Sequence, residues 1–245
     1  MKQFLLALQF LTIIPVRIKE VAEENIAQSM IFFPAVGLLL GVILCACDGL
    51  LSQLGLIRFC ADTLLVGLLI ILTGAIHLDG LADTVDAFAS GKDKDGMLRV
   101  MRDSNIGTMG ALSLILALLI KIGLISSLAS AKYPALILMC VLSRWAQVCA
   151  VFFLPYARGE GKAKLFIKGM NRNIFIFAGL SSLGIIFIAW RIKAILVFVS
   201  AAAFTWVCLK CLRRKFGGAT GDTIGAISEL AEIVVLFSVI ILEGG

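Results

Sequence analysis

The segment "LLVGLLIILTGAIHLDGLADTVDAF", residues 64–88, joins an uncharged run to a run that carries Asp79, Asp83 and Asp86. An open strand cannot cross lipid with its backbone groups unpaired, so a run this apolar predicts a membrane helix. Ionised side chains are costly within a bilayer and are functional candidates there. The segment therefore predicts a helix that reaches a membrane edge and places three acids at that edge.

The composition extends this interpretation to the whole chain. Of its 245 residues 60% are hydrophobic and 16% are charged, and the mean hydropathy is +1.04. In a soluble domain about a quarter of the residues are charged. The sequence therefore predicts an all-α, polytopic integral membrane protein and excludes an ordinary soluble domain.

Seven apolar runs are long enough, or nearly so, to cross a bilayer. We expect one membrane domain over residues 1–245, with about seven transmembrane helices between residues 31 and 242. Residues 1–30 are expected to form an N-terminal segment with a short interfacial or re-entrant helix. The predicted spans are Ile31–Ser52, Ala61–Leu78, Ile106–Leu128, Pro134–Leu154, Ile174–Trp190, Ala194–Leu209 and Gly225–Leu242.

The basic residues predict how these spans are oriented. Seven spans place most of the Lys and Arg residues of the loops on one face, Lys2, Arg17 and Lys19 among them. Loops rich in Lys and Arg stay in the cytoplasm, so we expect a cytoplasmic N-terminus and an external C-terminus. The net charge of +6 then reflects topology and does not indicate nucleic-acid binding. The other face receives only Arg58, Lys132, Arg191 and Lys193.

The three acids of the opening segment have helical spacing. Asp79, Asp83 and Asp86 are separated by four and three residues, which places them on one face of a helix. Carboxylates this close repel one another unless a cation holds them, and Mg²⁺ prefers a few carboxylates together with water and phosphate oxygens. The three are therefore predicted ligands of Mg²⁺. The alternative is an acidic helix end that is simply solvated.

The stretch "MLRVMRDSNIGTMG", residues 97–110, adds the chemistry of an anion site. Arg99 and Arg102 are three residues apart and are predicted to bind substrate phosphates, since guanidinium groups match phosphate oxygens. Asp103 follows Arg102 directly. Gly107 and Gly110 open the next span, where a helix N-terminus favours an anion. The alternative for the arginines is anchoring at the lipid headgroups.

The stretch "FGGATGDTIGAISELAE", residues 216–232, combines a glycine-rich turn with acids inside an apolar helix. A plain loop between spans can look similar, but acids within a span are functional candidates. Glu232 is a further acid of this kind. The predicted substrate-binding residues here are Gly217, Gly218, Thr220, Gly221, Asp222 and Glu229.

Three further polar residues lie within or beside predicted spans. Arg144 either neutralises the acids or binds a substrate phosphate. Lys121 is expected to extend its amine towards the membrane surface. His77, the only histidine, would project away from Asp79, so we expect it to pack in the interior or to support a metal ligand without binding the metal itself. Cys208 and Cys211 have the spacing of a metal or redox pair, but the chain has no second such pair.

These residues together favour metal-assisted phosphoryl transfer on the cytoplasmic side. A carboxylate could take the proton of an attacking hydroxyl, and a cation could offset the charge of a pyrophosphate leaving group. The competing hypothesis is an ion-coupled membrane transporter of a phosphorylated or anionic solute, since such carriers also contain buried acids and arginines. Gathering of the acids on one face and the lack of a visible inverted repeat argue against a transporter.

Four stretches resemble the cobalamin synthase family, adenosylcobinamide-GDP ribazoletransferase: "QFLTIIPV", "HLDGLADTVDAF", "MRDSNIGTMG" and "GGATGDTIGA". The resemblance covers essentially the whole chain. It departs at Ile13, Ala87 and Asn105, where the family often has a basic residue, a glycine and a basic residue. These departures leave the carboxylates intact.

The resemblance implies a transferase of cobalamin biosynthesis in the bacterial inner membrane, a cell membrane. It implies transfer from adenosylcobinamide-GDP to α-ribazole or its 5′-phosphate, release of GMP, and dependence on magnesium. In this interpretation Asp83 and Asp103 are catalytic, and Asp103 is either a further ligand or the base. The partners are the two substrates and the lipid bilayer, and a homo-oligomer is compatible with the sequence.

Overall fold

The computed structural model describes residues 2–16, 18 and 22–244, and every named element in them is a helix. The all-α prediction is therefore confirmed for these residues. Arg17 and Lys19, which the orientation argument uses, lie outside the described residues. The elements are α1 (Lys2–Leu11), α2 (Glu23–Gln28), the 3₁₀ helix η1 (Ser29–Phe32), α3 (Phe33–Gln53), α4 (Arg58–Thr73), α5 (Ile76–Ala89), α6 (Lys94–Val100), α7 (Thr108–Ser127), α8 (Lys132–Phe153), α9 (Ala163–Gly169), α10 (Arg172–Phe216) and α11 (Gly221–Gly244).

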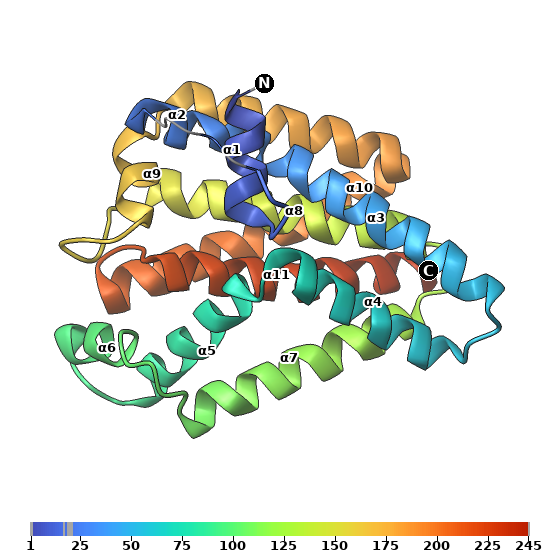
Figure 1. Cartoon of the computed structure of the whole chain (residues 1–245), viewed down its shortest axis with the longest axis horizontal. Coiled ribbons are helices and arrows are strands. Elements are labelled where there is room, and N and C mark those ends of the chain that lie inside the picture. The colour runs from blue at the N-terminus through green and yellow to red at the C-terminus, as the bar shows by residue number, and fades with distance from the viewer. Residues whose placement is uncertain (1, 17, 19–21, 245) are drawn as a thin grey trace.

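Helix α8 forms the centre of the bundle, with α3, α10 and α11 packed around it (Figure 1). Residues 138–151 of this helix are buried without interruption. Close packing is possible because α3 presents Gly37 to α8, where a methyl group would overlap the Cys140 carbonyl. A helix that is apolar on all sides is expected at such a central position.

The predicted span Ala61–Leu78 is wrong as a single straight helix. The structure breaks it after Thr73 and turns α5 by 91° from α4. Gly74 and Ala75 both have left-handed backbone angles, with φ of 62° and 56°. Glycine adopts this conformation without cost, and the carbonyl of Leu72 that the break leaves free accepts a 2.8 Å hydrogen bond from the Ile13 N–H. The break directs α5, with its acids, away from the axis of α4.

Helix α10 contains a second break, at Trp190 and Arg191, whose backbone angles are not helical. Its two arms lie side by side, because Phe175 of the first arm and Trp206 of the second both contact Phe153 of α8, at ring distances of 5.4 and 5.7 Å. The hairpin corresponds to the two predicted spans Ile174–Trp190 and Ala194–Leu209. Both ends of α10 therefore lie at the same end of the bundle (Figure 1).

Among the described residues, five helices are long and apolar enough to cross a membrane, or six if the bent pair α4–α5 is one span. This count takes α10 as one helix, so the expectation of about seven spans stays a prediction. Helix α1 is not among the five, and its buried residues pack towards η1 and α3. That position agrees with the expected short N-terminal helix.

Candidate active site

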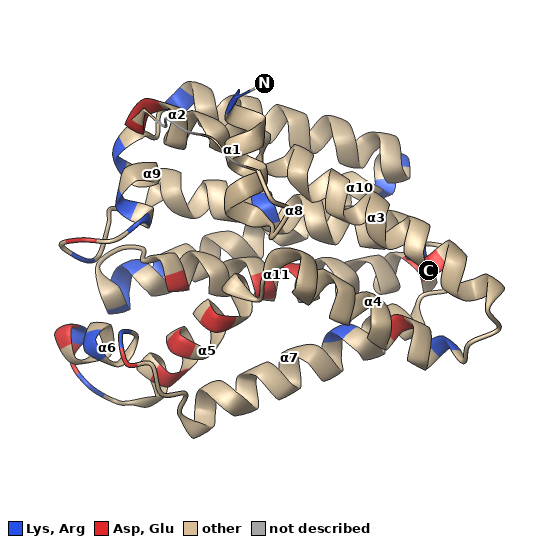
Figure 2. Ribbon diagram, in the orientation of Figure 1, with Lys and Arg blue, Asp and Glu red and all other residues tan. Residues whose placement is uncertain are grey.

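Helix α5 carries all three predicted magnesium ligands at the end of the bundle where α6 and α9 lie (Figure 2). Asp79 is exposed and Asp83 is half-buried. Within the described part of the chain, neither side chain takes part in a hydrogen bond or ion pair with protein. Two carboxylates one helical turn apart are therefore available to a ligand.

Asp86 has a different environment. Its two oxygens accept hydrogen bonds from the backbone N–H groups of Gly107 and Gly110, at 2.6 and 2.7 Å. These donors belong to the first turn of α7, where a helix leaves N–H groups without internal partners. The anion favoured by that helix N-terminus is thus Asp86 itself, and this contact competes with its predicted role as a magnesium ligand.

We expect Asp86→Asn to lower the stability of the fold. The amide can accept one of the two hydrogen bonds but turns an N–H towards the other donor, which costs about 1–3 kcal/mol. In a chain of this size the midpoint of thermal unfolding should fall by roughly 2–4 °C per kcal/mol. Asp95→Asn, on the exposed face of α6, is the control. Equal unfolding midpoints for the two variants in detergent would show that the Asp86 contact does not stabilise α7.

The glycine-rich turn between α10 and α11 divides into structural residues and cavity residues. Gly217 ends α10 with a φ of 73°, and Gly218 packs against the Pro155 carbonyl, where a side chain would overlap. Thr220 exchanges two hydrogen bonds with Thr223, of 2.8 and 3.2 Å, which caps the start of α11. Gly221 and Asp222 of this turn line a cavity.

The central cavity, of about 260 Å³, lies between α5, α8, α9 and α11. Its polar wall includes Asp79, Asp222, Arg158 and Lys162. An Arg158 Nη2 lies 2.7 Å from Asp222 Oδ2. Helices α5 and α11 approach closely here, since a side chain at Gly80 would come within 2.5 Å of the Asp222 carbonyl oxygen. This crossing brings acids 143 residues apart in sequence, Asp79 and Asp222, to one wall.

The loop cavity, of about 370 Å³, lies between α5 and the loop from α6 to α7. Asp79, Asp83, Arg102 and Asp103 all line it. Since Asp79 also lines the central cavity, the two cavities adjoin at this carboxylate. Arg99 is exposed and lines neither cavity, so the structure separates it from Arg102.

Asp103 is exposed, and its carboxylate already accepts hydrogen bonds from a neighbouring residue. Its Oδ1 accepts hydrogen bonds from the backbone N–H and the side-chain amide of Asn105, at 3.0 and 2.8 Å. These bonds lower the pKa of the Asp103 carboxyl. A lower pKa weakens a carboxylate as a proton acceptor, which favours Asp83 over Asp103 as a general base.

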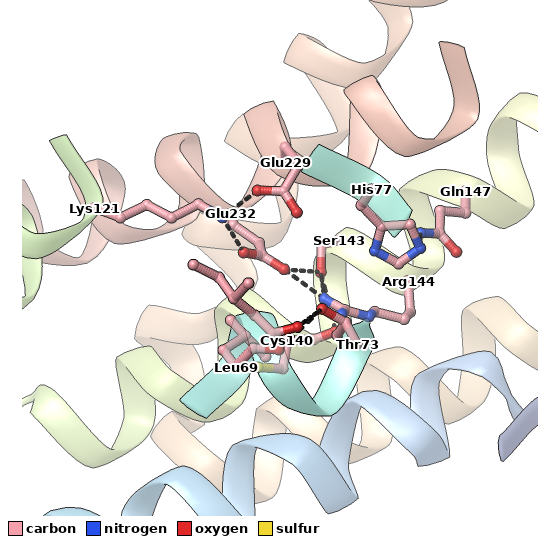
Figure 3. A network of polar contacts seen from close by, with 11 residues as sticks. Leu69, Thr73, His77, Lys121, Cys140, Ser143, Arg144, Gln147, Glu229 and Glu232 are labelled. Atoms are coloured by element: carbon pink, nitrogen blue, oxygen red, sulfur yellow. Dashed lines mark hydrogen bonds and ion pairs between the residues drawn. The ribbon is translucent and has the colours of Figure 1, made fainter. Parts of the chain in front are cut away.

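Arg144 and Glu229, both predicted to bind substrate, lie instead in a buried ion-pair network with Lys121 and Glu232 (Figure 3). The Lys121 amine lies 2.5 Å from an oxygen of each glutamate, and the Arg144 guanidinium lies 2.5 Å from Glu232. The expectation that Lys121 reaches the membrane surface is wrong, because only 3% of it is exposed. Two cations balance two anions, which explains how charges persist inside the bundle.

Sequence reasoning missed Arg158 as a site residue. It lies in "YARGEGKAK", residues 156–164, where the basic residues were interpreted only as a topological signal. Two glycines, Gly159 and Gly161, alternate with charged residues here and were the available clue to a binding loop. The Tyr156–Ala219 bridge joins this loop to the glycine-rich turn, so Arg158 reaches Asp222 through folding alone. The expectation that His77 is packed is confirmed, since 5% of it is exposed.

The donor set at the two cavities fits Mg²⁺. Asp79, Asp83 and Asp222 supply hard oxygen ligands. No group of three or more His, Cys, Asp or Glu residues in the described part of the chain forms a complete metal site. Mg²⁺ usually takes one or two carboxylates and completes its shell with water and substrate phosphates, so a partial site suits it.

Comparisons with known proteins identify the family of this chain. The sequence matches the family model described as "Cobalamin-5-phosphate synthase" over residues 3–240. The chain belongs to this family. An adenosylcobinamide-GDP ribazoletransferase of Geotalea daltonii is 37% identical over 245 residues, which cover 100% of this chain and 99% of that protein. One of Fusobacterium nucleatum subsp. nucleatum is 36% identical, over 99% of this chain and 98% of that protein. No solved structure matches.

The family match includes the residues that line both cavities. It extends from the first turn of α1 to the last turns of α11 and so includes every helix that lines them. A transferase of Desulforamulus reducens with the same name is 34% identical over 96% of this chain. Membership therefore rests on nearly the whole chain rather than on one motif.

Proposed function

We propose that this chain is a membrane-embedded adenosylcobinamide-GDP ribazoletransferase. It transfers the adenosylcobinamide-phosphate moiety to α-ribazole or its 5′-phosphate and releases GMP. The observation that carries the proposal is the meeting of free acids, Asp79 and Asp83, with Arg102 and Arg158 at two adjoining cavities. The relatives with full coverage all bear the name of this transferase, and nothing in the comparisons favours a transporter.

The reaction replaces one phosphorus–oxygen bond by another. A hydroxyl oxygen of the ribazole attacks the phosphorus next to the cobinamide, and the bond from that phosphorus to the bridging oxygen breaks. GMP leaves with the electron pair of that bond. Asp83 accepts the hydroxyl proton, because its carboxylate is free and half-buried and lines the loop cavity. Such general-base assistance contributes about 10²- to 10⁴-fold to a rate.

The basic residues of the two cavities bind the pyrophosphate. Arg102 lies in the loop cavity and Arg158 in the central cavity, on either side of Asp79. Guanidinium groups offer paired donors that match phosphate oxygens and stabilise charge on the leaving phosphate. Lys162 adds a further cation to the central cavity. The exposed Arg99 would act only on parts of the substrate that extend outside.

Asp79 and Asp222 would hold Mg²⁺, because both line the central cavity. The ion, when bound, would offset charge on the phosphate oxygens. In this assignment Asp83 is catalytic, and Asp222 replaces it as a magnesium ligand. Asp86 instead accepts hydrogen bonds from the start of α7. Asp103 supports the loop that carries Arg102.

We also propose that the site faces the cytoplasm of a bacterial cell, from the inner membrane. Lys and Arg residues gather at the end of the bundle formed by α6, α9 and the C-terminal end of α10 (Figure 2). Positively charged loops favour the cytoplasmic side. Both cavities lie at this end, where nucleotide-linked substrates are available. The product would be a late intermediate or product of cobalamin biosynthesis.

The test is GMP release by the purified protein in detergent. The assay supplies adenosylcobinamide-GDP and α-ribazole, together and singly. The proposal predicts GMP only when both substrates are present. A transporter has no compartments to act between in detergent, so an absence of GMP from folded protein would reject the transferase and return attention to transport in liposomes.

A further inference from the structure

The central cavity has two chemically different ends. Asp79, Asp222, Arg158 and Lys162 form the polar end. The aromatic end is a wall that we define as Phe10, Phe33 and Phe166 and that Met30 and Val151 extend. A pocket with an apolar body and a few polar groups is typical of a site for a small organic ligand.

The aromatic wall is assembled from three distant segments. Phe10 lies on α1, Phe33 at the start of α3 and Phe166 on α9. The Phe10 and Phe166 ring centroids are 4.6 Å apart, and Phe33 lies 6.1 Å from each. The N-terminal helix α1 therefore closes one side of this cavity, a role that its sequence does not indicate.

Two residues that line this cavity, His77 and Gln147, each have a buried polar atom without a hydrogen-bond partner in the described part of the chain. His77 Nε2 lies 2.9 Å from the Gln147 side-chain nitrogen, which can only donate, so His77 Nε2 accepts. The proton of the neutral imidazole is then on Nδ1, which has no hydrogen-bond partner in the described part of the chain. His77 lines the central cavity and is 5% exposed. The residues that line the cavity thus include one unpartnered N–H donor, His77 Nδ1, and one unpartnered acceptor, Gln147 Oε1.

We infer that the aromatic end of the central cavity binds the base of the ribazole substrate, with His77 as its hydrogen-bond donor. The inference rests on the proposed function and adds which substrate enters this cavity. The ribose then extends towards Asp79, where the two cavities adjoin and where the hydroxyl meets Asp83 in the loop cavity.

Two nucleotide bases could occupy the aromatic end, the ribazole base and guanine, and they differ in their polar groups. The ribazole base is a methylated benzimidazole, a flat bicycle with one free acceptor nitrogen and no N–H groups. It matches an aromatic wall with one donor. Guanine carries an amide, an amino group and a carbonyl, which are more polar groups than the single donor of His77 and the single acceptor of Gln147 can satisfy beside an apolar wall. Polar groups buried without partners weaken binding, so this end of the cavity favours the ribazole base.

Phe10→Ala tests the inference against Phe4→Ala as a matched control. Both residues are half-buried on α1, but Phe4 packs on Phe32, at a ring distance of 6.0 Å, and does not line the cavity. We expect Phe10→Ala to raise the KM for α-ribazole about tenfold, the scale of losing one stacked ring. The KM for adenosylcobinamide-GDP should stay unchanged, and Phe4→Ala should change neither constant.

Each other outcome has a defined meaning. A rise in the KM for adenosylcobinamide-GDP alone would assign the cavity to that substrate and overturn the inference. Unchanged constants in Phe10→Ala would also overturn it, since the wall would then contact neither substrate. If Phe10→Ala elutes as aggregate, Phe10→Leu keeps the apolar volume without the ring and is judged by the same two constants.

A binding measurement separates this inference from the proposed function. Equilibrium dialysis of α-ribazole against the protein in detergent needs no turnover. Wild-type and Phe4→Ala proteins should retain α-ribazole, whereas Phe10→Ala should retain about tenfold less at low ligand concentration. Equal retention by all three proteins would reject the aromatic site even if GMP is released. Absence of GMP release with selective retention would reject the transferase but keep the site.

Discussion

Replacement of Asp83 by asparagine should reduce GMP release by about 10²- to 10⁴-fold. Asparagine has nearly the same shape but cannot accept the hydroxyl proton. Asp83 makes no hydrogen bond or ion pair to other described residues, so its loss should not disturb the packing of α5. The KM values should change little in comparison with kcat. The measurement is the initial rate of GMP release by the purified variant with both substrates.

The control is again Asp95→Asn, which removes an exposed acid of α6 that lines neither cavity. It should retain the wild-type rate. Both variants should elute from a gel-filtration column like the wild type, which shows that the fold survives. Full turnover by Asp83→Asn would contradict its assignment as the base and would direct attention to Asp103.

Lys121→Met should cause a large loss of stability. Lys121 holds the two glutamates of α11 against α7, and its removal leaves them with Arg144 as the single cation of the network. Removal of one partner from a buried ion pair costs about 3–5 kcal/mol. We expect the midpoint of thermal unfolding in detergent to fall by roughly 10 °C.

A second substitution tests the charge balance. Adding Glu229→Gln to Lys121→Met leaves the Arg144–Glu232 pair, which is neutral overall. The double variant should recover a large part of the lost stability. A double variant less stable than Lys121→Met would show that packing, rather than charge balance, sets the cost. An unchanged midpoint in Lys121→Met would contradict a stabilising role for the network.

The parts of the fold that depend on local sequence were predictable. Apolar runs predicted helices, and the spacing of Asp79, Asp83 and Asp86 predicted one face of α5. The break at Trp190 was anticipated because Arg191 and Lys193 interrupt the apolar pattern. The sharp bend after Thr73 was missed, because a single glycine in an apolar run is compatible with a straight membrane helix.

The partners of each polar side chain were not predictable, since they come from distant segments. Asp86 contacts the start of α7, a helix that begins 22 residues later. Arg158, in the loop between α8 and α9, pairs with Asp222 in the first turn of α11. Arg144 and Glu229 carry the residue types of a substrate site, but burial pairs them with Lys121 and Glu232. Sequence identifies which residues are costly to place in a membrane, whereas only the fold shows whether protein or substrate compensates their charge.

The magnesium dependence of the reaction tests the proposed active site most directly. Purified protein receives adenosylcobinamide-GDP and α-ribazole with added Mg²⁺ or with excess chelator, and GMP and the cobamide product are quantified together. We expect equal amounts of GMP and cobamide with Mg²⁺ and a loss of both with chelator. GMP and cobamide formed equally well in chelator would contradict the magnesium site, and folded protein that forms neither product would contradict the transferase.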